Sequence, residues 1–195
     1  MESSPSPPTP EHPADRPENR PVLAIDVDGV LSLFGFDAPP TSEAVRFELI
    51  DGTPHFISIA AAERVRRLCR CFDPVWATGW QERANDRLSL ITGIGPLPVI
   101  EFDPRRESAG TAGTTAAHWK VPAIDAYCGD RPLAWIDDSF DQSCFEWADS
   151  REEAGSPTLL VPTEPMIGLE EAQASVISDW ADSLNGTPRP FDHLH

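Results

Sequence analysis

Lysine is almost missing from this sequence. The 195-residue chain has one lysine, Lys120, and fourteen arginines. An ammonium is a compact point charge, whereas a guanidinium is a planar fork, so a chain that keeps one lysine suggests a site that requires the smaller group. A single leftover lysine without a function is the alternative.

Positive charge is scarce as a whole. The formal net charge is −17 at pH 7. Sequence-independent binding to nucleic acid draws most of its energy from clustered Lys and Arg, so this balance disfavours it unless a local basic patch overrides the average. A plainer interpretation of the acidic residues is that they keep the protein soluble.

Long hydrophobic runs are also missing. No uninterrupted apolar segment approaches the ~20 residues that a membrane-spanning helix needs. The N-terminus has no basic region followed by an apolar stretch, so we expect no secretory signal and a cytoplasmic protein.

Cysteines are few and do not form a metal-binding pattern. No CxxC pair is present, and the five histidines have no zinc-like spacing to the cysteines. We therefore expect reduced, mostly buried thiols at Cys69, Cys71, Cys128 and Cys144.

Proline is concentrated at the N-terminus. Seven of the 21 prolines fall within residues 1–21, a composition typical of a disordered tail, with a ligand for an SH3-type domain as the functional alternative. We expect one domain over residues 21–187, because single domains commonly run ~100–200 residues, flanked by tails at 1–20 and 188–195.

Apolar segments with strand and helix patterns alternate through this domain. Such alternation predicts an α/β fold, a three-layer α/β/α Rossmann-like sheet, because parallel neighbours need helical crossovers. The expected strands cover residues 22–27, 74–78, 96–102, 132–138 and 157–162. The expected helices cover residues 58–71, 80–93, 116–129, 141–155 and 168–184.

One segment departs from the alternation. Residues 46–58 have two apolar-alternating arms around Asp51-Gly52, a residue pair that favours a tight turn. We expect a β-hairpin flap beside the carboxyl ends of the strands.

Acidic residues gather where two of the expected strands end. Asp26 and Asp28 follow the first strand, and Asp137 and Asp138 end the strand 132–138. Carboxylates that converge at one sheet edge repel one another unless a cation joins them, and Mg²⁺ is the natural hard-oxygen partner. Strand termination by Asp and Gly, and capping of the next helix by Asp138, are the structural alternatives.

A hydroxyl residue and the single lysine complete the set. Thr78 and Gly79 follow the strand 74–78, where a hydroxyl beside an exposed backbone N–H can clamp a phosphate oxygen. Lys120 lies in the expected helix 116–129. On its own, Thr-Gly more often only makes a turn.

The order Asp-x-Asp, Thr, Lys, Asp-Asp resembles the haloacid dehalogenase (HAD) superfamily of aspartate-nucleophile phosphohydrolases, over residues 22–162. VWATGW and LAWIDD look similar to the small HAD domains of Swiss Army knife RNA repair proteins. The resemblance implies that Asp26 is the nucleophile, that Asp28 is the acid and base, and that Thr78 and Lys120 hold the phosphoryl group. It also implies Mg²⁺ bound by Asp26, the backbone carbonyl of Asp28 and Asp137, with Asp138 in support.

The two places where HAD proteins insert cap domains are short here. We therefore predict the hairpin flap but no large cap. An uncovered site admits a phosphate on a large substrate, such as an oligonucleotide end, and Arg105 and Arg106 could contact its backbone. These arginines could instead pair with nearby acidic residues, and the substrate could be a nucleotide or another small metabolite.

Two other protein classes stay open. Phosphoacceptor receiver domains also combine acidic residues, a hydroxyl residue and a lysine, but their phosphorylated Asp lies on the third strand, where this sequence has Glu101-Phe102-Asp103. A catalytically silent HAD scaffold that binds a partner is the second.

Overall fold

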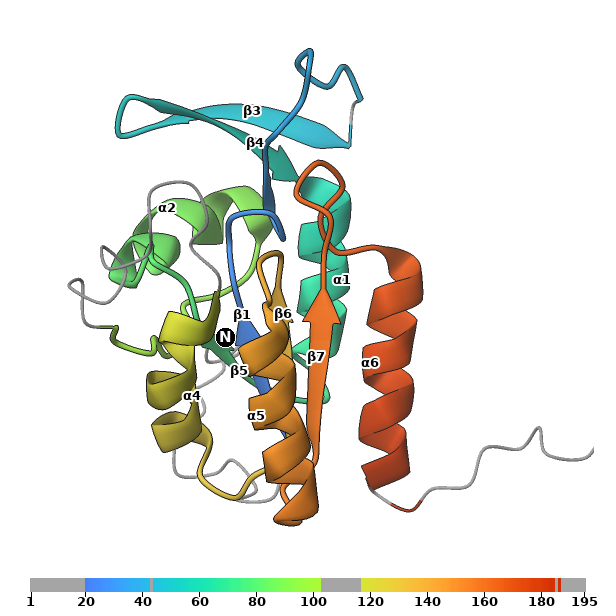
Figure 1. Ribbon diagram of the computed structural model, residues 1–195. Helices are drawn as coiled ribbons and strands as arrows, with labels where there is room; N and C mark the ends of the chain where they lie inside the picture. Colours follow the sequence, from blue (N-terminus) through green and yellow to red (C-terminus); the bar gives the residue numbers. More distant parts are fainter. Residues whose placement is uncertain (1–19, 43, 103–116, 185, 187–195) are drawn as a thin grey trace, which may run out of the picture.

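Strands and helices alternate along most of the chain in the computed structural model, which describes residues 20–42, 44–102, 117–184 and 186 (Figure 1). The strands are β1 (Val22–Ile25), β2 (Ser32–Leu33), β3 (Val45–Ile50), β4 (Thr53–Ser58), β5 (Asp73–Trp76), β6 (Leu133–Asp137) and β7 (Thr158–Pro162). The helices are α1 (Ile59–Leu68), α2 (Glu82–Thr92), the 3-10 helix η2 (Ala117–Lys120), α4 (Val121–Cys128), α5 (Gln142–Glu153) and α6 (Glu171–Leu184).

The main sheet is parallel and has the order β5-β1-β6-β7. Ile25 of β1 lies level with Trp76 of β5 and with Ile136 of β6. The residues that follow these three strands therefore emerge side by side at one edge of the sheet, which is where parallel α/β sheets place their ligands.

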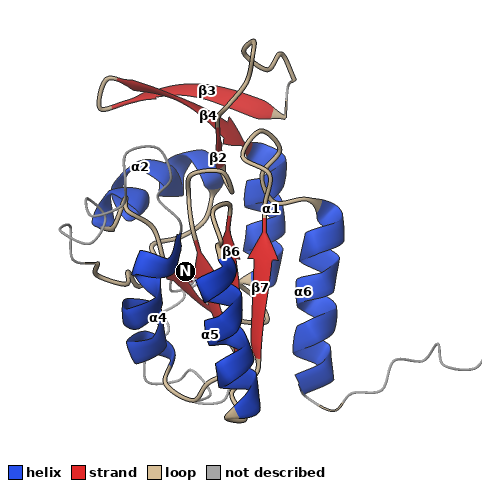
Figure 2. Cartoon of the chain, in the orientation of Figure 1, coloured by secondary structure: helices blue, strands red, loops and turns tan. Residues whose placement is uncertain are grey.

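Helices cover both faces of this sheet (Figure 2). Leu23 and Ile25 of β1 share a buried cluster with α1, α2 and α6, whereas Val22 and Ala24 share another with α4 and α5. Since successive strand residues point to opposite faces, one fully buried strand supplies both clusters. The predicted three-layer α/β/α arrangement is confirmed.

The predicted strand 96–102 is wrong. Only Val99 forms a bridge, to Trp76, with two backbone hydrogen bonds beside it: Trp76 N–H to the Pro98 carbonyl at 2.9 Å and Ile100 N–H to the Trp76 carbonyl at 2.9 Å. Pro96 and Pro98 have no N–H to donate, which prevents pairing with β5 on the N-terminal side of this bridge.

The predicted hairpin is confirmed. β3 and β4 pair antiparallel, and their turn places Asp51 at φ 51° and Gly52 at φ 83°, the left-handed conformations that an Asp-Gly turn supplies. Not predicted was β2, whose two residues pair with β4 to give a separate antiparallel sheet of order β2-β4-β3.

Ion pairs tie the hairpin turn to α2. Arg83 and Arg87, one helical turn apart, lie 3.1 and 2.6 Å from the two carboxylate oxygens of Asp51. These groups are partly exposed, so each pair contributes at most about 1 kcal/mol. The flap is nevertheless held over the helix that follows Thr78.

Helix starts differ from prediction by a few residues. The segment predicted as helix 116–129 begins with the 3-10 turn η2, and α4 follows with Pro122 in its first turn. The cap of α5 is Asp141, which accepts a hydrogen bond from the Cys144 N–H, and not Asp138.

All four cysteines have free thiols. Cys128 and Cys144 are buried as expected and Cys69 is half-buried, but Cys71 is exposed.

Three predictions lie outside the described residues: the two tails, apart from Arg20, and the pair Arg105 and Arg106.

In the described part of the chain, the segment from Asp28 to Thr78 contains β2, the hairpin, α1 and β5, and no further domain. None of the helices that the structure describes combines the length and apolar character needed to cross a bilayer.

Candidate active site

Asp26 is the first residue beyond β1. Its N–H donates to the Ile136 carbonyl at 3.0 Å, which fixes the main chain against β6. One side-chain oxygen accepts a hydrogen bond from the Val27 N–H at 2.8 Å, and only 6% of the residue is exposed. Asp26 is therefore a buried carboxylate held in one orientation at the centre of the sheet edge.

Lys120 ends the 3-10 turn η2 and reaches into the same place. Its Nζ lies 2.9 Å from Asp26 Oδ2 and 2.7 Å from Asp137 Oδ2, and the residue is 4% exposed. Burial alone would lower the pKa of Lys120, but the two carboxylates outweigh it and raise that pKa above its ordinary value. The single lysine of the sequence is thus a fixed cation between two buried acids.

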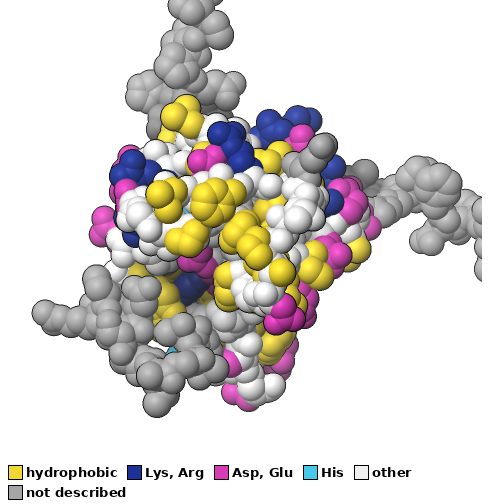
Figure 3. All heavy atoms as spheres, turned by 90° about the horizontal axis from the view of Figure 1, so that it is seen from above, with side chains coloured by type: hydrophobic (Ala, Val, Ile, Leu, Met, Phe, Trp, Pro, Cys, Tyr) yellow, Lys and Arg dark blue, Asp and Glu magenta, His cyan; other side chains and the backbone are white. Residues whose placement is uncertain are grey.

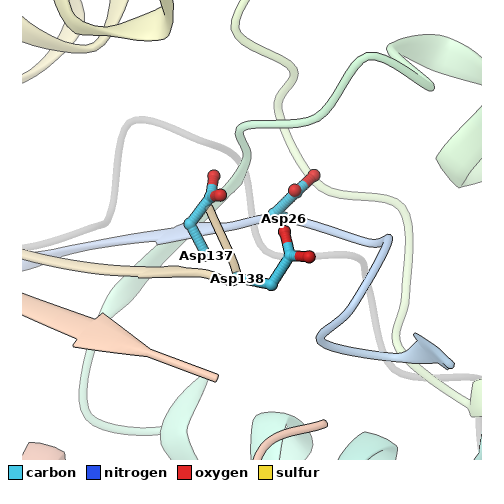
Figure 4. A group of neighbouring side chains, drawn as sticks. All are labelled: Asp26, Asp137 and Asp138. Atoms are coloured by element: carbon cyan, nitrogen blue, oxygen red, sulfur yellow. The ribbon is translucent and has the colours of Figure 1, made fainter. Parts of the chain in front are cut away.

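Asp137 and Asp138 follow each other at the end of β6. Asp137 is fully buried, and its second oxygen accepts hydrogen bonds from the Ser139 N–H at 3.1 Å and the Ser139 hydroxyl at 3.0 Å. Asp26, Asp137 and Asp138 each offer a carboxylate oxygen within 4.8 Å of the others (Figure 4). The sheet therefore brings together three of the four predicted metal-binding residues through their side chains.

One ammonium does not neutralise three carboxylates. Burial, with repulsion from Asp137 and Asp28, raises the pKa of Asp26 to about 7 despite the attraction of Lys120. Burial and Asp137 likewise raise the pKa of Asp138 to about 6. An additional cation would remove this repulsion, and the hard oxygen donors suit Mg²⁺.

Gly29 makes room for this cluster. A Cβ at this position would lie 2.4 Å from Asp138 Cγ, and the residue has φ 70°. Any other residue would both strain the backbone and displace the Asp138 carboxylate. The glycine of the Asp-x-Asp-Gly motif is thus required by the approach of the acidic pair on β6.

Asp28 lies beside the acidic cluster and is hydrogen-bonded to a tryptophan. Its Oδ2 accepts a hydrogen bond from Trp80 Nε1 at 2.8 Å. The Trp80 ring meets His55 of the hairpin edge to face, with centroids 4.8 Å apart, and His55 Nδ1 lies 2.9 Å from the Ser32 hydroxyl. A continuous series of contacts therefore joins the flap to the carboxylate at the mouth of the site.

These groups surround a cavity of about 200 Å³. Its polar lining comes from Asp26, Asp28, Lys120, Asp138 and Ser139, and its remaining lining is Phe34, Gly79 and Trp119. The cavity is small and strongly polar, with aromatic rings on its rim. Such a shape suits a compact anionic group bound beside a cation.

Thr78 does not line this cavity. It is fully buried, and its hydroxyl oxygen accepts a hydrogen bond from the Trp80 N–H at 3.3 Å, while the adjacent Gly79 is exposed at the cavity. The backbone at Gly79 is therefore the nearer candidate for contact with an anion, and the phosphoryl contact of Thr78 stays a prediction.

The sequence analysis did not identify Trp80, Ser139, Phe34 or Trp119. Ser139 follows the Asp-Asp pair directly, and Trp80 follows Thr78-Gly79, so proximity to the motifs was a usable signal for these two. Trp119 directly precedes Lys120 and had the same signal. Phe34 has no such signal, because only the fold brings it to the rim.

Comparison with known proteins adds no family assignment. No family model matches the chain, and no curated protein matches it.

Proposed function

We propose that the protein is a Mg²⁺-dependent phosphomonoesterase of the HAD type, acting through an aspartyl-phosphate on Asp26. The observation that carries the proposal is the buried arrangement at the sheet edge, in which Lys120 lies between Asp26 and Asp137 and Asp138 completes an acidic cluster. A purely structural ion pair would not need a third carboxylate beside it.

The metal would be held by Asp26, Asp137 and Asp138. When bound, Mg²⁺ supplies positive charge that offsets the repulsion between the nucleophilic carboxylate and the phosphoryl oxygens. The fit rests on the three oxygens within 4.8 Å and on the excess of negative charge over the single ammonium.

The chain's own residues account for the two transfers. A carboxylate oxygen of Asp26 attacks phosphorus, the bond from phosphorus to the leaving oxygen breaks, and Asp28 gives that oxygen its proton. Water then attacks the phosphorus of the aspartyl-phosphate while Asp28 takes a proton from the water, and phosphate leaves with Asp26 restored. Lys120 holds Asp26 in position and faces the phosphoryl oxygens.

Trp80 has a positioning role in this scheme. Its indole N–H donates a hydrogen bond to one oxygen of Asp28, which leaves the other oxygen free to exchange protons with the leaving group and the water.

We expect the substrate to be a phosphate on a large molecule, such as an oligonucleotide end. The support is that the described residues contain a flap but no separate cap over the cavity.

A phosphatase screen with the purified protein tests the proposal. The substrates are nucleotides, sugar phosphates and oligonucleotides phosphorylated at the 5′ or 3′ end, each with Mg²⁺ and with EDTA. We expect turnover that EDTA abolishes and that Asp26→Asn reduces to below a few per cent, because an amide cannot accept a phosphoryl group. Circular dichroism of Asp26→Asn is the control for folding, and activity retained by that variant would contradict the nucleophile assignment.

A further inference from the structure

The outer strand of the hairpin has an unpaired edge. In the sheet β2-β4-β3, β3 pairs with β4 on one side, and no strand among the described residues pairs with its other side. Figure 1 shows the hairpin extending away from the main sheet and helices, with β3 outermost. A free, flat edge is a template for another strand, and proteins usually blunt or cover it.

The register identifies the backbone groups that point outward. The Ile59 N–H donates to the Ala44 carbonyl at 2.9 Å, so residues 44 and 59 form a hydrogen-bonded pair at the start of the β3–β4 ladder. Hydrogen-bonded and non-hydrogen-bonded pairs alternate in antiparallel ladders. The N–H and C=O groups of Val45, Phe47 and Leu49 therefore point away from β4. The Val45 N–H donates to the Ser42 carbonyl at 3.0 Å, and the other groups face the free edge.

The same three residues have exposed apolar side chains. Phe47 is 59% exposed and Leu49 66% exposed, and Val45 is partly exposed. The Phe47 ring contacts Phe56 with centroids 5.5 Å apart, and Phe36 contacts Phe56 at 5.6 Å, which extends this apolar face. Figure 3 looks down on this end of the molecule and shows hydrophobic side chains gathered across it. Clustered exposed hydrophobic residues of this kind mark an interaction surface.

We propose that β3 is a homodimer interface, in which β3 of a second copy of this chain pairs antiparallel with it about a twofold axis at Phe47. Phe47 then faces its own counterpart and Val45 faces Leu49, so both backbone groups of Phe47, the Leu49 N–H and the Val45 C=O are paired across the axis, while the Val45 N–H keeps its hydrogen bond to the Ser42 carbonyl. The two hairpin sheets become one six-stranded sheet. A twofold axis closes the assembly, because each edge is used once.

Charge complementarity selects the second copy as the partner and fixes the register. In chain order, residues 45–49 are apolar, basic, aromatic, acidic and apolar. Arg46 and Glu48 form an ion pair within one chain, and the antiparallel pair of strands also places each Arg46 opposite the Glu48 of the other copy. A shift by two residues in either direction keeps the same outward groups facing but sets Arg46 against Arg46 or Glu48 against Glu48. Opposite charges across a strand pair stabilise it and like charges destabilise it.

The proposal does not depend on phosphatase activity, and its test measures mass. Sedimentation velocity or light scattering after gel filtration, from about 1 μM to about 500 μM, covers the range in which a small interface dissociates. We expect a concentration-dependent dimer of the wild-type chain. Monomer throughout that range would overturn the proposal.

Charge reversal tests the register. Arg46→Glu alone and Glu48→Arg alone each set like charges opposite one another, so each variant should be monomeric where the wild type is dimeric. An equimolar mixture of the two variants restores opposite charges, as does the double variant R46E/E48R, and both should dimerise again. Glu63→Arg, an exposed reversal on α1, is the matched control and should behave as wild type. A dimer that survives both single reversals, or a mixture that stays monomeric, would contradict this interface.

Discussion

Replacing Lys120 by methionine removes the one positive charge in the acidic cluster while keeping most of the length of the side chain. In the wild type, Lys120 is 4% exposed, and its ammonium lies 2.9 Å from an oxygen of Asp26 and 2.7 Å from an oxygen of Asp137. Asp26 is 6% exposed and Asp137 is 0% exposed. The variant leaves two buried carboxylates facing each other without a counter-charge. The expected result is a large loss of stability in the metal-free protein.

The size of the loss follows from burial. Removing one partner of a buried ion pair costs about 3–5 kcal/mol because the other charge stays buried and uncompensated. A typical domain unfolds with about 5–15 kcal/mol, so the variant loses a substantial share of its stability. The loss should be smaller at pH 5 than at pH 8, because Asp26, whose pKa is raised to about 7, is largely protonated at pH 5 and then needs no ammonium.

Urea unfolding followed by tryptophan fluorescence, in EDTA at both pH values, measures this difference. Arg67→Met is the control, because Arg67 and Glu171 form an exposed ion pair with side chains 51% and 58% accessible, of the kind that contributes at most about 1 kcal/mol. A loss below about 1 kcal/mol for Lys120→Met at pH 8 would refute the view that this ammonium holds the cluster together. An equal loss at pH 5 and pH 8 would refute the role assigned to Asp26.

The remaining predictions concern the same cluster. Lys120→Arg should reduce kcat severely although the charge is kept, because a planar guanidinium does not fit the space of an ammonium; near-normal kinetics would contradict this. Trp80→Phe should lower kcat/KM strongly for alkyl phosphates and little for p-nitrophenyl phosphate, whose leaving group needs no proton from Asp28; an equal loss for both would indicate a structural role only. Without Mg²⁺, stability should fall as the pH rises from about 4 to about 7. The folded chain keeps protons on Asp26 and Asp138, with pKa values of about 7 and 6, that the unfolded chain releases near 3.8. Mg²⁺ displaces those protons, so urea unfolding should show a larger Mg²⁺ stabilisation at pH 8 than at pH 5, and an equal effect would count against metal binding at this cluster.

Local signals predicted much of the fold. The alternation of apolar segments predicted the parallel sheet with helices on both faces, and Asp51-Gly52 predicted the hairpin, because a turn that needs positive φ is determined by two adjacent residues. The prediction of a strand at 96–102 was wrong because it relied on apolar content and did not take into account that Pro96 and Pro98 have no N–H to donate. β2 was missed because its two residues are too few to show a period.

The candidate site was predictable where the sheet alone determines it. Parallel register places the carboxyl ends of β1 and β6 side by side, so Asp26 and Asp137 could be paired from the sequence. The hydrogen bond from Trp80 to Asp28 joins residues 52 positions apart and depends on how the loop after β5 turns. The same turn buries Thr78, and no pattern in the sequence indicates its direction.

Identification of the phosphorylated residue tests the central claim most directly. The protein is mixed with Mg²⁺ and p-nitrophenyl phosphate and quenched in acid, and acyl phosphate is reduced with borohydride, which converts a phosphorylated aspartate to homoserine. Peptide mass spectrometry should then find homoserine at position 26 only, and only when both substrate and Mg²⁺ were present. Phosphate release without modification at position 26, modification at another aspartate, or no phosphate release from any substrate in the screen would contradict the account.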